Sequence, residues 1–248
     1  MSSDAIFTAF TKENLDACLS KLAKEFRKLN GTKMPAEIIL IGGAAILANY
    51  GFRDMTYDID AIIRASSSMK DAINKVGDEL GLPNGWLNSD FTKTKSYSPK
   101  LLQYSEYYKR FGYVLEVRTV SGEYLVAMKL MSGRQYKNDI SDIVGILQEQ
   151  KDRGKPLTLE MIKEAVCNLY GSWENLPNES IELIENIMRD EQYETLYEEY
   201  RQNERIAKES LIDFESKYPG VTTTDNVNDI IKALQKRKEE TKINKPQS

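Results

Sequence analysis

An aliphatic run that ends in two glycines constrains the fold of this chain more than any other feature. Residues 37–41 are almost continuously aliphatic, which is typical of a strand buried on both faces. Gly42 and Gly43 follow at once, and residues 44–50 have the composition of a short helix. This order predicts a central strand, a tight glycine turn and a helix.

Two carboxylates follow in a second predicted strand, residues 56–64. Because side chains alternate along a strand, Asp58 and Asp60 are expected on one side, with Ile59 in the core. Two carboxylates about 7 Å apart repel each other unless a cation lies between them. Mg²⁺ (or Mn²⁺) is a cation that takes such oxygen ligands, so the pattern favours a divalent-metal site. The alternative is an ordinary strand end, since a D-x-D pattern is frequent by chance.

The glycine pair is a candidate phosphate-binding turn. Gly42 and Gly43 would let the backbone approach a phosphate and present amide N–H groups from a helix start. Their spacing fits neither the GxGxxG dinucleotide fingerprint nor the GK[ST] of a P-loop. Arg53 and Thr56 could orient the same phosphate, or could only brace the strand. An ordinary strand-to-helix turn is the competing interpretation.

A third carboxylate is needed in many metal-assisted transfer reactions, to activate the attacking hydroxyl. Glu116 is the candidate, because it lies mid-strand in residues 113–120, where a free charge would be costly. A salt bridge with Arg118 explains the same residue equally well.

A second cluster of charge lies between residues 129 and 142. Lys129 stands among apolar residues of a predicted helix, and Arg134 and Lys137 follow it. Asp139 and Asp142 are three residues apart, on one face of the next predicted helix. The cations could hold a triphosphate while the aspartates position them. From spacing alone, a solvated and salt-bridged helical hairpin is the preferred interpretation.

Composition removes several classes of enzyme. The chain of 248 residues contains no histidine, which excludes Ser-His-Asp and Cys-His hydrolases and HExxH zinc proteases. Cys18 and Cys167 form no CxxC pair, so we expect buried free thiols in a reducing cytoplasm. No apolar run approaches the roughly 20 residues of a membrane span, and the N-terminus lacks a leader pattern. The expectation is a soluble, cytoplasmic protein without a membrane partner.

The periodicity predicts an α+β fold, a small mixed sheet with flanking helices, followed by an all-α C-terminal domain. The predicted domains are residues 1–152 and 153–248, joined by a polar hinge at 151–156. Residues 83–100 are predicted as a long loop, and residues 101–110 fit a short helix or an irregular strand. Helices are predicted over 11–30, 44–50, 68–80, two segments within 122–150, 158–169, 179–189, 190–216 and 226–240.

The glycine pair, the D-x-D pair and the Lys-Arg-Lys-Asp-Asp segment together resemble the DNA polymerase β-like nucleotidyltransferase superfamily. More narrowly, the chain is similar to AbiEii-type toxins and related uncharacterised nucleotidyltransferase-fold proteins over roughly residues 36–148. Two departures from the family pattern stand out. An extra residue, Asn138, separates Lys137 from Asp139, and no motif fixes the third carboxylate.

The resemblance implies roles for individual residues. Gly42 and Gly43 would contact the triphosphate, and Asp58 and Asp60 would bind metal. The phosphate-side cations would be Lys129, Arg134 and Lys137. The acidic pair that orients them or assists the acceptor would be Asp139 and Asp142.

The implied activity is transfer of a nucleoside monophosphate from a nucleoside triphosphate to RNA (tRNA) or to a protein, with a cognate antitoxin as a further partner. The alternative is an inactive binding or regulatory protein with the same fold. A phosphohydrolase fits less well, since a DxDx[TV] motif is absent.

Overall fold

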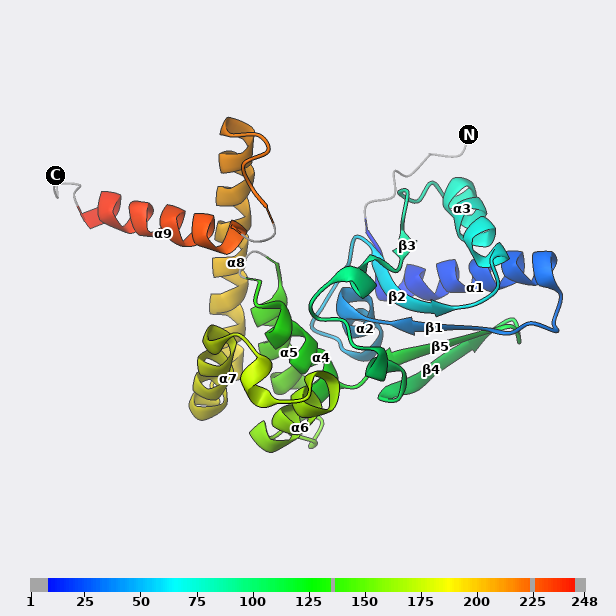
Figure 1. Cartoon of the computed structure of the whole chain (residues 1–248), viewed down its shortest axis with the longest axis horizontal. Coiled ribbons are helices and arrows are strands. Elements are labelled where there is room, and N and C mark those ends of the chain that lie inside the picture. The colour runs from blue at the N-terminus through cyan, green and yellow to red at the C-terminus, as the bar shows by residue number, and fades with distance from the viewer. Residues whose placement is uncertain (1–8, 135–136, 224–225, 244–248) are drawn as a thin grey trace. The chain divides into compact units, whose positions relative to one another are not determined.

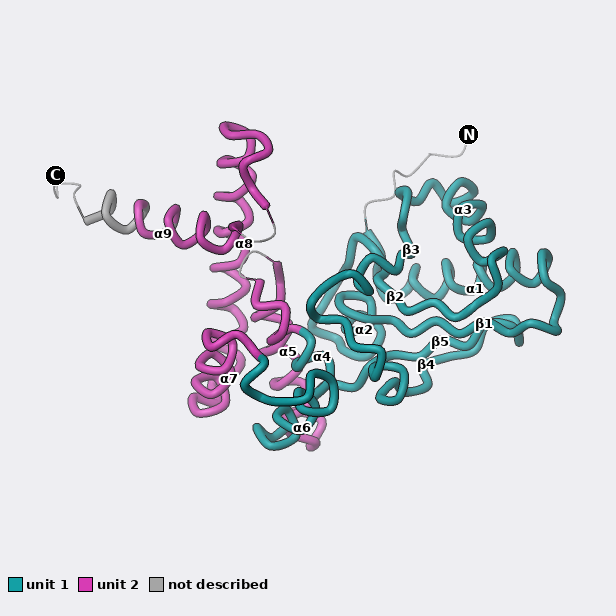
Figure 2. The backbone as a smooth tube through the Cα atoms, viewed as in Figure 1, with its two compact units in different colours: residues 1–128, 157–175 teal, residues 129–156, 176–248 magenta. Residues whose placement is uncertain are grey.

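The computed structural model describes residues 9–134, 137–223 and 226–243 (Figure 1). The chain divides into two compact units (Figure 2). Unit 1 contains residues 1–128 and 157–175, and unit 2 contains residues 129–156 and 176–248. The predicted domain boundary at residue 152 falls inside unit 2, at the end of a helix, and stays a prediction.

Unit 1 is built on a five-stranded sheet in the order β3-β2-β1-β5-β4. The strands are β1 (Ala36–Leu40), β2 (Ile59–Arg64), β3 (Leu87–Asn88), β4 (Ser105–Phe111) and β5 (Leu115–Val120). The central strand β1 runs antiparallel to β2 and parallel to β5, so the sheet is mixed. Four of the five residues of β1 are buried, as the aliphatic run predicts.

Helices and short 3-10 turns complete unit 1. They are α1 (Lys12–Asn30), α2 (Gly42–Asn49), α3 (Ser68–Leu80), most of α4 (Gly122–Ser132), α6 (Leu159–Tyr170), η1 (Asp90–Lys93), η2 (Pro99–Leu102) and η3 (Trp173–Asn175). A capping box between Thr11 and Asn14 starts α1, and Gly31, with φ of 67°, ends it. α1 packs beside α3 (Figure 1). α6 belongs to this unit and contacts η2, and Ser98 donates to the carbonyl of its residue Leu169.

The secondary structure of unit 2 is entirely helical among its described residues, with turns between the helices. It contains the end of α4, α5 (Asp139–Asp152), α7 (Asn178–Asp190), α8 (Tyr193–Lys217) and α9 (Val227–Ile243). α5 packs along α8, whose buried residues Tyr193, Glu204 and Ala207 are 11 and three residues apart and so lie on one face of the helix. This packing buries the first turns of α5.

The predicted fold class is confirmed: a small mixed sheet with flanking helices, and a helical C-terminal region. Several predicted boundaries are wrong. β2 begins at Ile59 rather than at residue 56, and α2 begins at Gly42 rather than at residue 44. The ambiguous residues 101–110 hold the end of η2 and most of β4.

The predicted long loop at 83–100 is more structured than expected. It contains β3, η1 and the start of η2. Trp86 anchors it, because its side chain is buried and its indole nitrogen donates to the carbonyl of Ile73 on α3. The buried aromatic ring therefore orders a segment whose composition is that of a loop.

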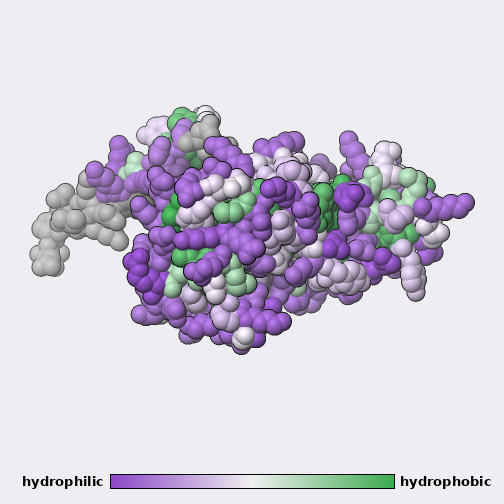
Figure 3. Space-filling model, turned by 60° about the horizontal axis from the view of Figure 1, so that its bottom comes forward, coloured by the Kyte–Doolittle hydropathy of each residue, from purple (hydrophilic) through white to green (hydrophobic). Residues whose placement is uncertain are grey.

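On the face shown in Figure 3, hydrophobic residues are interspersed among hydrophilic ones. Large side chains such as Tyr113 and Ile212 are exposed at single positions. Within the parts of the chain that the structure describes, every helix is too short or too polar to cross a membrane.

Candidate active site

Gly42 and Gly43 form the first turn of α2, directly after β1. Gly42 has φ of 54°, a left-handed conformation that glycine adopts without the cost of a Cβ. A Cβ atom at residue 42 would lie 3.8 Å from Oδ2 of Asp60. The glycine turn therefore borders one of the two predicted metal-binding carboxylates.

Gly43 meets two other predicted residues. A Cβ atom at residue 43 would lie 2.7 Å from Oγ1 of Thr56 and 2.9 Å from Nη2 of Arg53, which is too close for either contact. The absence of a side chain at residue 43 allows this approach. The structure thus brings Gly42, Gly43, Arg53, Thr56 and Asp60 together.

A short backbone pairing holds the segment that carries Arg53 and Thr56. Thr56 is buried and forms an isolated antiparallel bridge with Phe10, with N···O distances of 2.7 and 2.9 Å. Its hydroxyl donates to the carbonyl of Asp58 at 3.2 Å. Arg53 Nε donates to the carbonyl of Met55 at 3.1 Å. Thr56 is therefore a brace as well as a neighbour of the glycine turn.

The two aspartates lie in different local structures. Asp60 is the second residue of β2, is partly buried, and accepts a backbone bond from Ile41 at 3.0 Å. Asp58 is exposed and precedes the strand. Asp58 therefore lies outside the strand predicted to carry both aspartates, and a shared face for the two side chains stays a prediction.

Glu116 lies away from the glycine turn. In the register of the sheet, Glu116 stands opposite Glu37 of β1, whereas Asp60 is bonded to Ile41, four residues further along. Four residues correspond to roughly 13 Å along β1. Its carboxylate pairs with Arg110 at 2.7 Å and with Arg118 at 3.3 Å. The hydrogen bond from Arg110 is the main reason that its pKa is lowered. This placement favours the salt-bridge interpretation, and β5 carries no other acidic residue.

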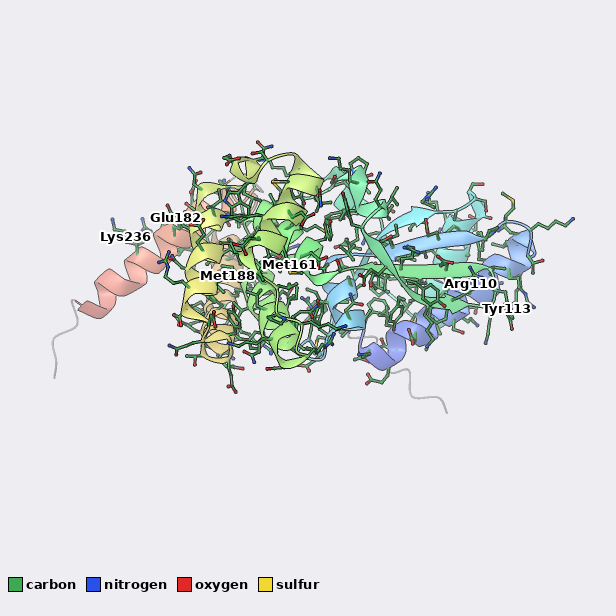
Figure 4. All side chains as sticks on the ribbon, turned by 90° about the horizontal axis from the view of Figure 1, so that it is seen from below. Arg110, Tyr113, Met161, Glu182, Met188 and Lys236 are labelled. Carbon is green, nitrogen blue, oxygen red and sulfur yellow. The ribbon has the colours of Figure 1, made fainter. Side chains whose placement is uncertain are left out.

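The same end of the sheet carries a band of ion pairs beside an open hollow of about 570 Å³. Glu37 pairs with Arg64 at 3.1 Å, and Arg110 lies on the β4–β5 hairpin with Tyr113 (Figure 4). Residues lining the hollow are Thr32, Pro35, Ala36, Glu37, Arg64, Arg110, Tyr113, Val114 and Glu116. The charges of Glu37 and Glu116 are thus compensated within the sheet.

In unit 2, Lys129 is the centre of a buried charge cluster. Its ammonium lies 2.8 Å from Oδ1 of Asp139 and 2.7 Å from Oδ2 of Asp142. All three residues are at most 8% exposed. Arg134 adds a second cation, with Nε 2.8 Å from Oδ2 of Asp139. The cluster pairs two cations with two carboxylates, as buried charges require.

Electrostatics hold the cluster in its charged form. Burial alone would raise the pKa of Asp139, but Lys129 and Arg134 outweigh it and keep this pKa well below its usual value. Lys137 is exposed, and its carbonyl accepts from the backbone of Asp139. Lys137 is therefore near the cluster in sequence, although its side chain faces solvent.

A cavity of about 240 Å³ adjoins the cluster within unit 2. Its lining comprises Lys129, Leu130, Ser132, Gly133, Arg134, Asp139, Ile140, Ile143, Pro177, Glu179, Ser180, Leu183 and Asn228. One wall is apolar, and the charged cluster forms another.

Comparison with known proteins identifies the family. Residues 17–208 match the family described as "Nucleotidyltransferase of unknown function (DUF6036)". The chain belongs to this family. The match spans the glycine turn, both aspartates and the Lys129 cluster. The membership supports nucleotidyltransferase activity at a coarse level and does not point to AbiEii-type toxins specifically. Neither a curated protein nor a solved structure matches the chain.

Metal binding in this DUF6036 member would depend on few ligands. Within residues 9–134, 137–223 and 226–243, no three acidic, cysteine or histidine side chains form a metal-binding group. Asp60 and Asp58 still offer carboxylate oxygens of the kind that Mg²⁺ and Mn²⁺ prefer. A divalent ion here would need further oxygens from phosphate and water.

Sequence reasoning missed Glu204 on α8. One oxygen of this buried carboxylate accepts from the backbone N–H groups of Ile140 at 2.8 Å and Ser141 at 3.2 Å. It therefore caps the helix that carries the two aspartates of the cluster. The available signal was a glutamate on the same helical seam as Tyr193, Tyr197, Tyr200 and Ala207.

Proposed function

We propose that this member of the nucleotidyltransferase family transfers a nucleoside monophosphate from a nucleoside triphosphate to an acceptor, in a reaction that depends on Mg²⁺ or Mn²⁺. The observation that carries the proposal is the convergence of Gly42, Gly43, Arg53, Thr56 and Asp60 at the start of α2. A helix start with a close-approach glycine suits a phosphate group, and a carboxylate beside it suits a cation bound to that phosphate.

The reaction has a simple balance of atoms. A hydroxyl oxygen of the acceptor attacks the α-phosphorus and forms a new P–O bond. The bond from the α-phosphorus to the bridging oxygen breaks, and pyrophosphate leaves. The hydroxyl proton passes to solvent or to a carboxylate of the protein. Catalysis of such a step depends on positioning and on stabilising negative charge.

Roles follow for the residues of unit 1. The backbone of Gly42 and Gly43 would approach the triphosphate, and Arg53 would contribute a guanidinium suited to phosphate. Asp60, with Asp58, would hold the divalent ion, which when bound would offset the charge of the triphosphate. Thr56 would keep Arg53 and the glycine turn in register.

In unit 2, the family resemblance assigns Lys129, Arg134 and Lys137 to the phosphates. Asp139 and Asp142 would then orient Lys129, since both bind its ammonium. We also propose RNA, tRNA in particular, or a protein as the acceptor, and a cognate antitoxin as a partner. These assignments rest on the resemblance alone.

A second candidate is a nucleotide-binding protein that no longer catalyses transfer. Two observations favour it: Glu116 lies roughly 13 Å along the sheet from the level of Asp60, and Lys129 is neutralised by two aspartates. Such a protein would bind a triphosphate with its ion and release no pyrophosphate.

The test incubates the protein with each α-labelled ribonucleoside triphosphate, Mg²⁺ and total tRNA, and again without RNA so that the protein is the acceptor. Pyrophosphate release and label transfer are both measured. Asp60→Asn is the test variant. Asp78→Asn, an exposed aspartate on α3, is the matched control.

Label on RNA or protein that is lost in Asp60→Asn and kept in Asp78→Asn supports the transferase and identifies the nucleotide and the acceptor. Nucleotide binding without pyrophosphate release supports the binding protein. A folded protein that binds no nucleotide in the presence of Mg²⁺ overturns both proposals.

A further inference from the structure

The first turn of α5 has no cap of its own. Asn138 occupies the N-cap position, and its side chain makes no capping hydrogen bond. The first backbone N–H groups of a helix need an acceptor from elsewhere when they are buried. Glu204 on α8 supplies one, at 2.8 Å from the nitrogen of Ile140 and 3.2 Å from that of Ser141.

This cap comes at a cost, because Glu204 is only 4% exposed. Its second oxygen, Oε2, has no hydrogen-bond partner among the residues that the structure describes. The negative charge of Asp142 further disfavours the ionised form of Glu204. A local serine or threonine could cap a helix without burying a charge. The position of this carboxylate therefore calls for an explanation beyond helix stability.

The capped turn carries the anionic half of the charge cluster. Asp139 is the first residue of α5 and Asp142 lies one turn further, and both bind the ammonium of Lys129. A shift of this turn by a fraction of an ångström would lengthen both ion pairs. Glu204 is thus bonded to the same turn of α5 whose aspartates bind Lys129.

We propose that Glu204 is a positioning residue for nucleotidyl transfer, which fixes the first turn of α5 and so sets the place of Lys129. The inference rests on the proposed function, since it assumes that Lys129 serves that reaction. It adds a residue from α8, near the end of the segment that matches the family, to the machinery.

The test compares two variants of nearly equal volume. Glu204→Gln keeps an oxygen that can accept from both backbone N–H groups, whereas Glu204→Met removes the acceptor without leaving a cavity. Glu209→Met, at an exposed position of α8, is the control for the loss of a carboxylate from this helix. The readouts are kcat and KM for pyrophosphate release, and hydrogen exchange of the amides of Ile140 and Ser141.

The expected result is a fall in kcat of tenfold or more in Glu204→Met, with KM for the nucleotide changed less than twofold. Glu204→Gln should stay within threefold of the unmodified chain, and Glu209→Met should match it. The two amides should exchange at least tenfold faster in Glu204→Met alone. Unchanged kcat and unchanged exchange in a folded Glu204→Met protein would overturn the proposal.

The two proposals fail in distinguishable ways. If the unmodified chain transfers no nucleotide, the proposed function is refuted. The positioning of Lys129 can then still be tested, by amide exchange together with the rate at which a lysine-specific reagent labels Lys129. Faster exchange and faster labelling in Glu204→Met would still support the positioning of Lys129 by Glu204. If neither rate changes, the positioning is also refuted.

Discussion

The backbone of Gly43 approaches Thr56 so closely that a Cβ atom at residue 43 would lie 2.7 Å from the threonine hydroxyl oxygen. Thr56 is held on the other side by its bridge to Phe10 and cannot retreat freely. The glycine turn and the segment that leads to Asp60 are therefore tightly packed against each other, and this close contact can be tested.

Gly43→Ala should destabilise the protein by about 1–3 kcal/mol, because the added methyl group overpacks against Thr56 and Arg53. The measurement is the free energy of unfolding in urea. In a double-mutant cycle, Thr56→Ala should recover part of the lost stability, since it removes the hydroxyl oxygen that the added methyl group would contact too closely. Additive effects of the two substitutions would contradict the contact.

Lys129→Met should cost about 3–5 kcal/mol, because it leaves Asp139 and Asp142 buried without their shared cation. The midpoint of chemical denaturation reports the loss. Lys217→Met, which breaks an exposed ion pair with Asp213, should cause no measurable change. Adding Asp142→Asn to Lys129→Met should restore some stability. Equal midpoints for the two lysine variants would refute the buried cluster.

The stability of unit 2 should depend on pH through Glu204. Burial is the largest cause that raises the pKa of Glu204 to about 7, and Asp142 adds to it, against the bonds from Ser141 and Ile140. The pKa of Glu204 in the folded state exceeds the unfolded value of 4.5, so the protonated form of Glu204 favours the folded state. This contribution to the free energy of unfolding is complete below pH 4.5 and is lost as pH rises through 7.

The pH effect can be isolated with Glu204→Gln, which cannot ionise. The free energy of unfolding of this variant, minus that of the unmodified chain, should increase by about 3 kcal/mol between pH 5 and pH 8. Denaturation curves at both pH values measure the difference. A constant difference between the two proteins would show that Glu204 does not titrate in this range.

Glu116→Gln should leave Mg²⁺-dependent nucleotide binding and pyrophosphate release unchanged, because this carboxylate is engaged with Arg110 and Arg118. Titration of a fluorescent triphosphate measures binding, with Asp60→Asn as the positive control for a loss. A similar loss in both variants would restore Glu116 as the candidate third carboxylate.

Much of the fold is predictable from local pattern. The run before Gly42 and the periodicity of residues 68–80 identify a strand and a helix, because a single apolar period determines each of them. The start of β2 is not predictable in this way. Before the strand, Thr56 pairs instead with Phe10, which lies 46 positions away in sequence, and no local pattern indicates this pairing.

In the candidate site too, features close in sequence are predictable and those that depend on long-range contacts are not. Arg53, Thr56 and Asp60 are near the glycines in sequence, and the structure gathers them. Glu204 lies more than 60 residues from the two backbone N–H groups that it caps, and no local pattern connects them. Long-range contacts of buried polar groups are thus the part that single-sequence reasoning misses.

The bridge between Phe10 and Thr56 also bears on how shortened versions of the chain should be made. The family match begins at residue 17, which invites an expression boundary at that point. Such a boundary would delete Phe10, whose fully buried ring lies 5.9 Å from that of Trp86. Without this residue, we expect the glycine turn to be less well supported in the truncated protein, and a missing activity could then be an artefact of the chosen boundary.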